Sequence, residues 1–284
     1  MFRILLNFLK FVLVVTGAVF LSTLAINAAD SWKNPENSML AGALSSITKK
    51  APCPEGMTYV GAPAGGYCID VYENSASESC LYDDPKNQEE TRSDIADVKC
   101  VPISAKGASP WRNISQNQAM QACAKAGKRL PTNEEWFFAA LGTSDSSSGW
   151  KTSDCNVNKN RDTFDPALTG SGENCVSPLG VYDMVGNVWE WVGETIKEGK
   201  FDGVAVPATG YVASADEKGI PSETSATSSD PNYNNDRFWV KKEGVSGMFR
   251  GGFWASGSDA GIYTVHSEMS PSFVGTAVGF RCVK

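Results

Sequence analysis

Residues 250–282 read RGGFWASGSDAGIYTVHSEMSPSFVGTAVGFRC, and the two ends of this segment differ in kind from its middle. Arg250–Gly252 with Trp254, and Gly279–Cys282, carry the glycine and cysteine residues expected of a rigid frame. The middle follows no helical period and only a broken alternation, so neither pattern of buried residues explains it. Large apolar side chains stand there beside small or charged ones, a mixture typical of an exposed binding face.

The middle of this segment therefore supplies our predicted ligand-binding residues. The alternative is an ordinary strand-and-loop terminus with incidental exposed residues, which composition alone would favour. The predicted residues are Phe253, Ala255, Ser256, Asp259, Tyr263, His266, Glu268, Met269, Phe273, Val274, Gly275 and Ala277. The aromatic and methionine side chains among them are the types that anchor protein interfaces.

Three further motifs occur upstream. They are CIDVYE at 68–73, GKRLPTNEEW at 127–136 and GVYDMVGNVWEW at 180–191. Together with the frame of residues 250–282, they resemble the formylglycine-generating-enzyme, or sulfatase-modifying-factor, family. The resemblance implies an α+β, C-type-lectin-like fold, with two helices packed on short, mostly antiparallel strands and a high coil content.

Within that family, the frame with its irregular middle resembles the variable region of a diversity-generating-retroelement variable protein. Gly257 and Gly261 fall at the spacing that such a region shows. This resemblance implies a binding protein without chemistry, whose partner is an unknown protein or cell-surface ligand. The alternatives are a divergent formylglycine-generating-type enzyme and a structural envelope protein.

The ligands of the enzymatic relatives are missing from this chain. In the family frame, the two copper-binding cysteines fall at Ser256 and Gly261, and neither residue offers the thiolate that copper(I) requires. The iron-dependent relatives use several histidines, whereas this chain has only His266. We therefore expect no copper, no iron and no catalysis, and we interpret His266 as a surface contact or a spectator.

The resemblance also implies a calcium site in the 180–191 motif. Its ligands would be the side chains of Asp183 and Glu190 and the carbonyls of Gly186 and Val188. Carboxylates mixed with main-chain carbonyls suit calcium. The alternative is that Glu190 and Asn187 only form hydrogen bonds within a tight turn beneath two core tryptophans.

The chain has eight cysteines and no CxxC pair, so disulfides are a better interpretation than a metal or redox site. Eight cysteines allow 105 connectivities. The family resemblance implies the pair Cys123–Cys282. Proximity along the chain suggests Cys80–Cys100 and Cys155–Cys175, which leaves Cys53–Cys68.

The start of the chain predicts export. Residues 1–29 have the charge, apolar run and small residues of a signal peptide, and the alternative is an uncleaved membrane anchor. Residues 30–50 predict a linker, and 51–284 a single domain that contains the variable segment 250–282. The formal net charge of −7 and the absence of a basic patch argue against nucleic-acid binding. We expect a secreted or cell-surface protein.

Local signals predict the main elements of the domain. Ser115 with Gln118, and Thr132 with Glu135, form capping boxes that begin two helices, the first ending before Gly127. Residues 57–72 predict two short strands around a glycine- and proline-containing turn. Residues 73–100, 142–149 and 201–237 are polar or rich in glycine and serine, and predict loops.

Overall fold

The computed structural model describes residues 53–62, 65–145, 154–157 and 165–284. The predicted signal peptide, its alternative as an anchor and the predicted linker all lie outside these residues. None of the helices in the described ranges has the length and hydropathy needed to cross a bilayer. The domain that begins at Cys53 forms one compact unit.

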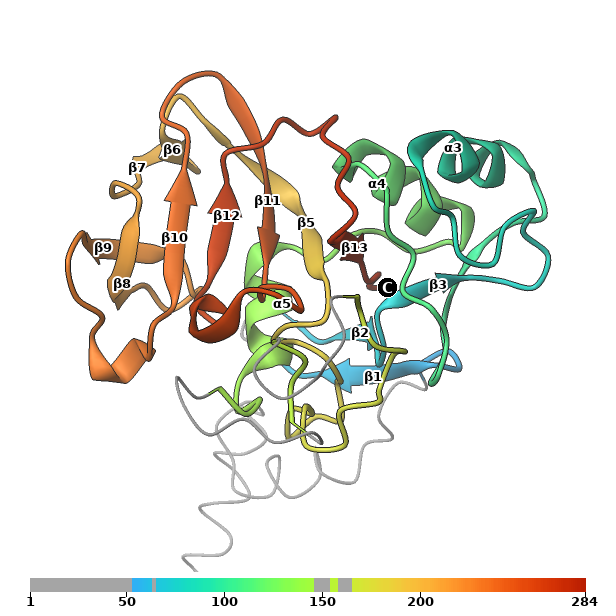
Figure 1. Cartoon of the computed structure of the whole chain (residues 1–284), viewed down its shortest axis with the longest axis horizontal. Helices are drawn as coiled ribbons and strands as arrows, with labels where there is room; N and C mark the ends of the chain where they lie inside the picture. Colours follow the sequence, from blue (N-terminus) through green and yellow to red (C-terminus); the bar gives the residue numbers. More distant parts are fainter. Residues whose placement is uncertain (1–52, 63–64, 146–153, 158–164) are drawn as a thin grey trace, which may run out of the picture. The chain divides into compact units, whose positions relative to one another are not determined.

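A nine-stranded mixed sheet organises the second half of the chain (Figure 1). Its main path runs β7-β6-β5-β11-β12-β10-β8-β9, and β13 pairs with β5 beside that path. The β10–β12 and β13–β5 pairs are parallel and the others antiparallel. The strands are β5 (Trp189–Lys197), β6 (Lys200–Phe201), β7 (Val204–Ala205), β8 (Gly210–Ala215), β9 (Pro221–Ser225), β10 (Arg237–Val240), β11 (Val245–Arg250), β12 (Val265–Ser267) and β13 (Val278–Phe280).

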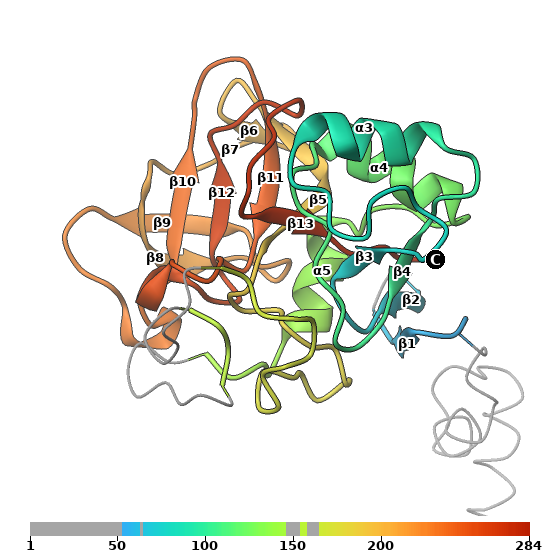
Figure 2. The same ribbon diagram turned by 45° about the vertical axis from the view of Figure 1, so that its right-hand side comes forward.

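Two antiparallel pairs precede this sheet. The first, β1 (Met57–Val60) with β2 (Tyr67–Asp70), is the predicted pair of short strands, and the second is β3 (Asn74–Ala76) with β4 (Pro102–Ser104). The end of the chain returns to this region, where Lys284 and Cys68 exchange two main-chain hydrogen bonds. Figures 1 and 2 both show the chain end beside these strands.

The two predicted helices are confirmed. α4 (Gln116–Lys125) and α5 (Asn133–Ala140) begin with complete capping boxes at Ser115 and Thr132, and both helices contact β5. A third helix, α3 (Gln88–Ala96), lies within the segment that was predicted to be a loop. It lacks an apolar stripe because the side chains that it buries are the polar Thr91 and Asp94.

The predicted loop at 201–237 is also wrong, because this segment contributes β7, β8, β9 and parts of β6 and β10 to the sheet. Its strands expose serine and threonine, so the apolar alternation is sparse. Val212 and Ile220 nevertheless reach the core, where they join Phe238. The α+β class and the mostly antiparallel strands are as expected, and the arrangement is consistent with a C-type-lectin-like fold.

Four disulfides connect the scaffold, and they join the same pairs that the sequence suggests: Cys53–Cys68, Cys80–Cys100, Cys123–Cys282 and Cys155–Cys175. The Cys123–Cys282 bond attaches α4 to the chain end inside a cluster that contains Trp111, Trp191 and Phe280. A second cluster surrounds Trp136 on α5. A set of four disulfides is typical of a protein from an oxidising, extracellular compartment.

Candidate functional site

Burial separates the frame of residues 250–282 from its middle. All eight frame residues, from Arg250–Gly252 and Trp254 to Gly279–Cys282, are buried. None of the twelve predicted ligand-binding residues is buried. Ala255 and Glu268 are exposed, and the other ten are partly exposed. The frame therefore belongs to the core, whereas the twelve predicted residues between its parts reach the surface at least in part.

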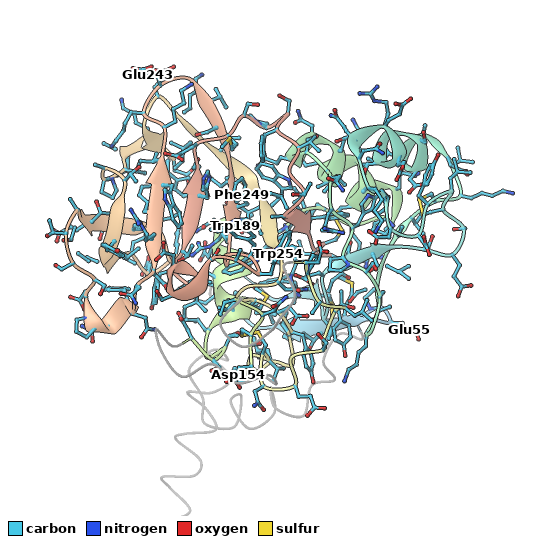
Figure 3. The ribbon with its side chains drawn as sticks, viewed as in Figure 1. Glu55, Asp154, Trp189, Glu243, Phe249 and Trp254 are labelled. Carbon is cyan, nitrogen blue, oxygen red and sulfur yellow. A yellow bond between two sulfur atoms is a disulfide. The ribbon has the colours of Figure 1, made fainter. Side chains whose placement is uncertain are left out.

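Part of this segment lines a hollow of about 230 Å³, here called the C-terminal hollow. Trp189 from β5 and Phe249 from β11 form part of its wall, and Figure 3 shows both among the central strands. Five predicted residues contribute to the lining, namely His266, Met269, Phe273, Gly275 and Ala277, together with Thr276 and Val278. Trp189 and Phe249 were not predicted as site residues, because Trp189 was interpreted as core and Phe249 lies outside the variable middle.

His266 is an integral part of an aromatic cluster, which corrects its interpretation as a surface contact or spectator. Its side chain is only 16% exposed, and its ring stacks on Phe249 with a centroid distance of 4.6 Å. Trp189 and Trp239 approach the imidazole to 5.9 and 5.6 Å between ring centroids. Burial lowers the pKa of His266 to about 4, so the imidazole is neutral at physiological pH.

This buried imidazole predicts a loss of stability in mild acid. Between pH 6.5 and 4, the unfolded chain protonates His266 while the folded chain does not, so the unfolded state binds more protons and is favoured as the pH falls. We expect His266 to lower the free energy of unfolding by about 2–3 kcal/mol across this window. Urea unfolding of the wild type and of His266→Gln measures the effect as a difference, which cancels the contributions of other groups. A constant difference from pH 7 to pH 4 would contradict the prediction.

The remaining predicted residues do not line the hollow. Tyr263 packs against Phe137 and Tyr233, with centroid distances of 5.2 and 4.8 Å, on the other hydrophobic cluster. Asp259 lies 3.7 Å from Arg237 between charged atoms. Ser256 accepts a hydrogen bond from the main chain of Phe253, and Ala255, Glu268 and Val274 also lie outside the lining. The predicted face is thus divided between the hollow and a second surface around Tyr263.

Glu190, one of the four predicted calcium ligands, is engaged in a buried ion pair. Both carboxylate oxygens of Glu190 accept hydrogen bonds from Arg281 at 2.6 Å, and one also accepts from Trp136 Nε1 at 2.7 Å. Glu190 and Arg281 are 1% and 0% exposed, so this is a buried ion pair. A calcium ion bound to Glu190 would have to displace a cation that already saturates its carboxylate.

The other members of this motif fit the alternative, a hydrogen-bonded turn. Asn187, in the left-handed region with a φ of 57°, donates to Glu73 and accepts from Asn156 and from the main chain of Ala167. Asp183 Oδ2 accepts a hydrogen bond from Gly170 N at 2.6 Å. Of the predicted calcium ligands Asp183, Gly186, Val188 and Glu190, the two carboxylates are thus already hydrogen-bonded, which favours the alternative of a hydrogen-bonded turn.

Glu73, which was not predicted as a site residue, completes this network. Its carboxylate accepts hydrogen bonds from Asn187 Nδ2 at 2.6 Å and from Val188 N at 3.1 Å. Burial raises the pKa of Glu73 well above its usual value, and the charges of Asp183 and Glu190 raise it further. Glu190 is the only one of these three acids that bonds directly to Arg281 among the described residues, whereas the charges of Glu73 and Asp183 act on the guanidinium without a direct bond. Glu73 is the last residue of the CIDVYE motif, which indicates the family but does not predict this contact.

Residues 66–284 match the family of sulfatase-modifying factor enzyme 1-like domains, and the chain belongs to that family. Inactive C-alpha-formylglycine-generating enzyme 2 of Bos taurus is 30% identical over 120 residues, which are 38% of this chain and 40% of that protein. The formylglycine-generating enzyme of Thermomonospora curvata is 34% identical over 100 residues, which are 30% and 33% of the two chains. The chain thus spans about two fifths or less of the length of these relatives.

The solved structures to which this chain shows a low similarity include the Major Tropism Determinant M1 Variant. It is 20% identical, and the match covers 81% of this chain and 52% of that one with a TM-score of 0.43. Treponema denticola variable protein 1 is 16% identical over 80% of this chain and 94% of its own, with a TM-score of 0.39.

Proposed function

We propose that this chain is an exported, non-catalytic binding protein that presents a diversified face, residues 253–277, to a protein or cell-surface ligand. The observation that carries the proposal is that the frame of residues 250–282 is buried, whereas the twelve predicted residues between its parts are exposed or partly exposed and five of them line an aromatic hollow. Because the frame residues belong to the core, the exposed side chains of the middle, such as Ala255 and Glu268, can change at a small cost in folding free energy.

The C-terminal hollow suits an apolar anchor of the ligand. Its walls are mainly aromatic and aliphatic, and the one titratable group among its lining residues, His266, is neutral near pH 7. Binding hot spots commonly consist of an aromatic or aliphatic side chain that enters such a dehydrated pocket. We therefore propose that the ligand inserts an aromatic or branched aliphatic group, and that charged groups remain at the rim near Glu268.

Three features support binding without catalysis. All eight cysteines are bonded in disulfides, so no thiolate is present for copper. At Gly261, one of the copper-ligand positions of the family frame, a Cβ atom would lie 1.8 Å from Asp236 Oδ1, so a side chain there would require Asp236 to move. The only histidine, His266, packs among aromatic rings. The runner-up, a divergent formylglycine-generating-type enzyme, would require another set of ligands.

The specific proposal of a retroelement variable protein has a genomic test. We expect a near-copy of the DNA that encodes residues 250–282 to lie beside a reverse-transcriptase gene and to differ mainly at adenines. If the neighbouring genome contains no such copy, diversification is excluded, although binding at the hollow would still have to be tested.

The binding proposal predicts that the hollow carries most of the affinity. The ligand for this test is selected from a displayed peptide or protein library. Met269→Ala removes a side chain from the lining, and Ala277→Phe fills the hollow without removing a contact. Each is expected to weaken the binding of that ligand by about 30-fold or more, the effect of losing one hot spot. The matched control is Met120→Ala on α4, where the methionine is 47% exposed and lies outside the hollow. Titration calorimetry measures affinity, and melting curves verify the fold. Unchanged affinity in folded Ala277→Phe would refute the proposal.

A further inference from the structure

Two acidic side chains meet at the loop that precedes β12. Asp145 follows α5, and Asp236 directly precedes β10. Each uses its Oδ2 atom to accept a main-chain N–H from this loop, Asp145 from Ile262 at 3.3 Å and Asp236 from Tyr263 at 2.7 Å. Because the two donors are consecutive residues, both carboxylates are held against the same short piece of backbone, in which Gly261 provides the space for Asp236.

The second oxygen of each carboxylate makes no hydrogen bond, although the side chains of Asn234 and Thr264 lie close enough to lower the pKa of Asp145 and of Asp236, respectively. Asp145 Oδ1 and Asp236 Oδ1 are both buried without a hydrogen bond. Asp236 as a whole is only 1% exposed. Buried polar atoms are almost always satisfied in folded proteins, so two orphaned carboxylate oxygens at one place call for an explanation. None of the ion pairs within 4.0 Å among the described residues includes Asp145 or Asp236.

The nearby cation, Arg250, makes its hydrogen bonds to other acceptors through its two terminal nitrogens, and its Nε atom is buried without a hydrogen bond. Its guanidinium donates to Asn133 Oδ1, to Gly219 O at 3.0 Å and to Ile262 O at 2.8 Å. Burial raises the pKa of Asp145 to about 6, and burial and the charge of Asp145 raise that of Asp236 well above its usual value. The charge of Arg250 lowers the pKa of Asp236 but offsets only part of this rise, so the two carboxylates resist full ionisation and the pair favours a proton or a metal ion.

We propose that Asp145 and Asp236 bind a hard divalent cation, of the calcium class, between the end of α5 and the loop before β12. Two carboxylates match a charge of +2. The described residues at the site offer oxygen and neither imidazole nor thiolate, which disfavours zinc and copper. Asp145 is partly exposed, so water can complete the coordination shell. The ion would fix the backbone that carries Tyr263, one of the predicted variable residues.

This site is separate from the calcium site that the sequence suggests. At the latter, the Glu190 carboxylate is neutralised by Arg281, whereas here two oxygens remain open. The inference also does not depend on the proposed ligand-binding function, because neither Asp145 nor Asp236 lines the C-terminal hollow. The two can therefore fail separately.

The test is metal binding by the full chain after treatment with a chelator. At pH 7.5, about 10 mM calcium is expected to raise the Tm by roughly 3–10 °C, given dissociation constants of 10⁻⁴–10⁻³ M for extracellular sites. Terbium is expected to show luminescence sensitised by the nearby tyrosine Tyr263 and to be displaced by calcium. If the wild type shows neither the rise in Tm nor the luminescence, the proposal is overturned.

Variants assign the site. Asp145→Asn and Asp236→Asn, which preserve shape, should each abolish the calcium response, whereas Asp165→Asn, at an acid whose side chain is 82% exposed, should retain it. In chelator, both site variants should melt no lower than the wild type, because each replaces a buried carboxyl group whose ionised form is unfavourable at this place. A calcium response that persists in Asp236→Asn or Asp145→Asn would place the ion elsewhere and overturn the assignment. The terbium measurement on the wild type remains decisive if a variant does not fold.

Discussion

Glu190→Ala is expected to lower the free energy of unfolding by about 3–5 kcal/mol, and calcium is expected not to change this loss. The substitution leaves the guanidinium of Arg281 buried without its carboxylate, because Arg281 is 0% exposed. It also removes the acceptor of Trp136 Nε1 on α5. Chemical denaturation of both proteins, with and without calcium, measures the difference.

The matched control is the same substitution in a surface pair. Glu134 lies 3.7 Å from Lys218, with side chains that are 29% and 46% exposed, so Glu134→Ala should cost less than about 1 kcal/mol. Glu190→Ala, Arg281→Ala and the double variant complete a thermodynamic cycle, in which we expect a coupling of about 2 kcal/mol or more. A calcium-dependent Tm that disappears only in Glu190→Ala would restore the calcium site that the sequence suggests.

The elements that the sequence predicts correctly are those with local signals. Ser115 and Thr132 begin helices through contacts three residues away, so a short window contains the information. α3 carries a local signal as well, since Asn87 caps it by accepting from Glu89 and Glu90. It was nevertheless missed, because burying polar Thr91 and Asp94 removes the apolar periodicity that normally identifies a helix.

The site is predicted only in part for the same physical reason. The frame and the surface-reaching middle can be distinguished along the chain, but the walls of the hollow come from distant strands. Trp189 faces the loop of residues 269–277 only because β5 lies between β11 and β13 in the sheet. The Glu190–Arg281 pair depends on the same register, which sets Gly279 opposite Glu190. In the sequence, a carboxylate that binds a calcium ion cannot be distinguished from one that pairs with an arginine, because the arginine is brought close only when the sheet forms.

Removal of the Cys123–Cys282 bond should have the largest effect among the four disulfides. Its sequence separation of 159 residues exceeds that of every other pair. The chain-entropy relation assigns about 5 kcal/mol to a closed loop of this length and about 3 kcal/mol to one of 20 residues. The bond also holds β13 and the end of the frame, which adjoin the C-terminal hollow at Val278.

The experiment compares Cys123→Ala/Cys282→Ala with Cys80→Ala/Cys100→Ala, whose pair has a separation of 20 residues. The first double variant should lose about 2 kcal/mol more in urea unfolding than the second, and its affinity for a selected ligand should fall because β13 is no longer tied to α4. Peptide mapping without reductant should find the Cys123–Cys282 bond in the wild type. Free thiols at both positions would contradict the bond itself. An equal loss of unfolding free energy in the two variants would show that the long loop does not constrain the unfolded chain. In either case the frame would depend on the Glu190–Arg281 pair and its packing.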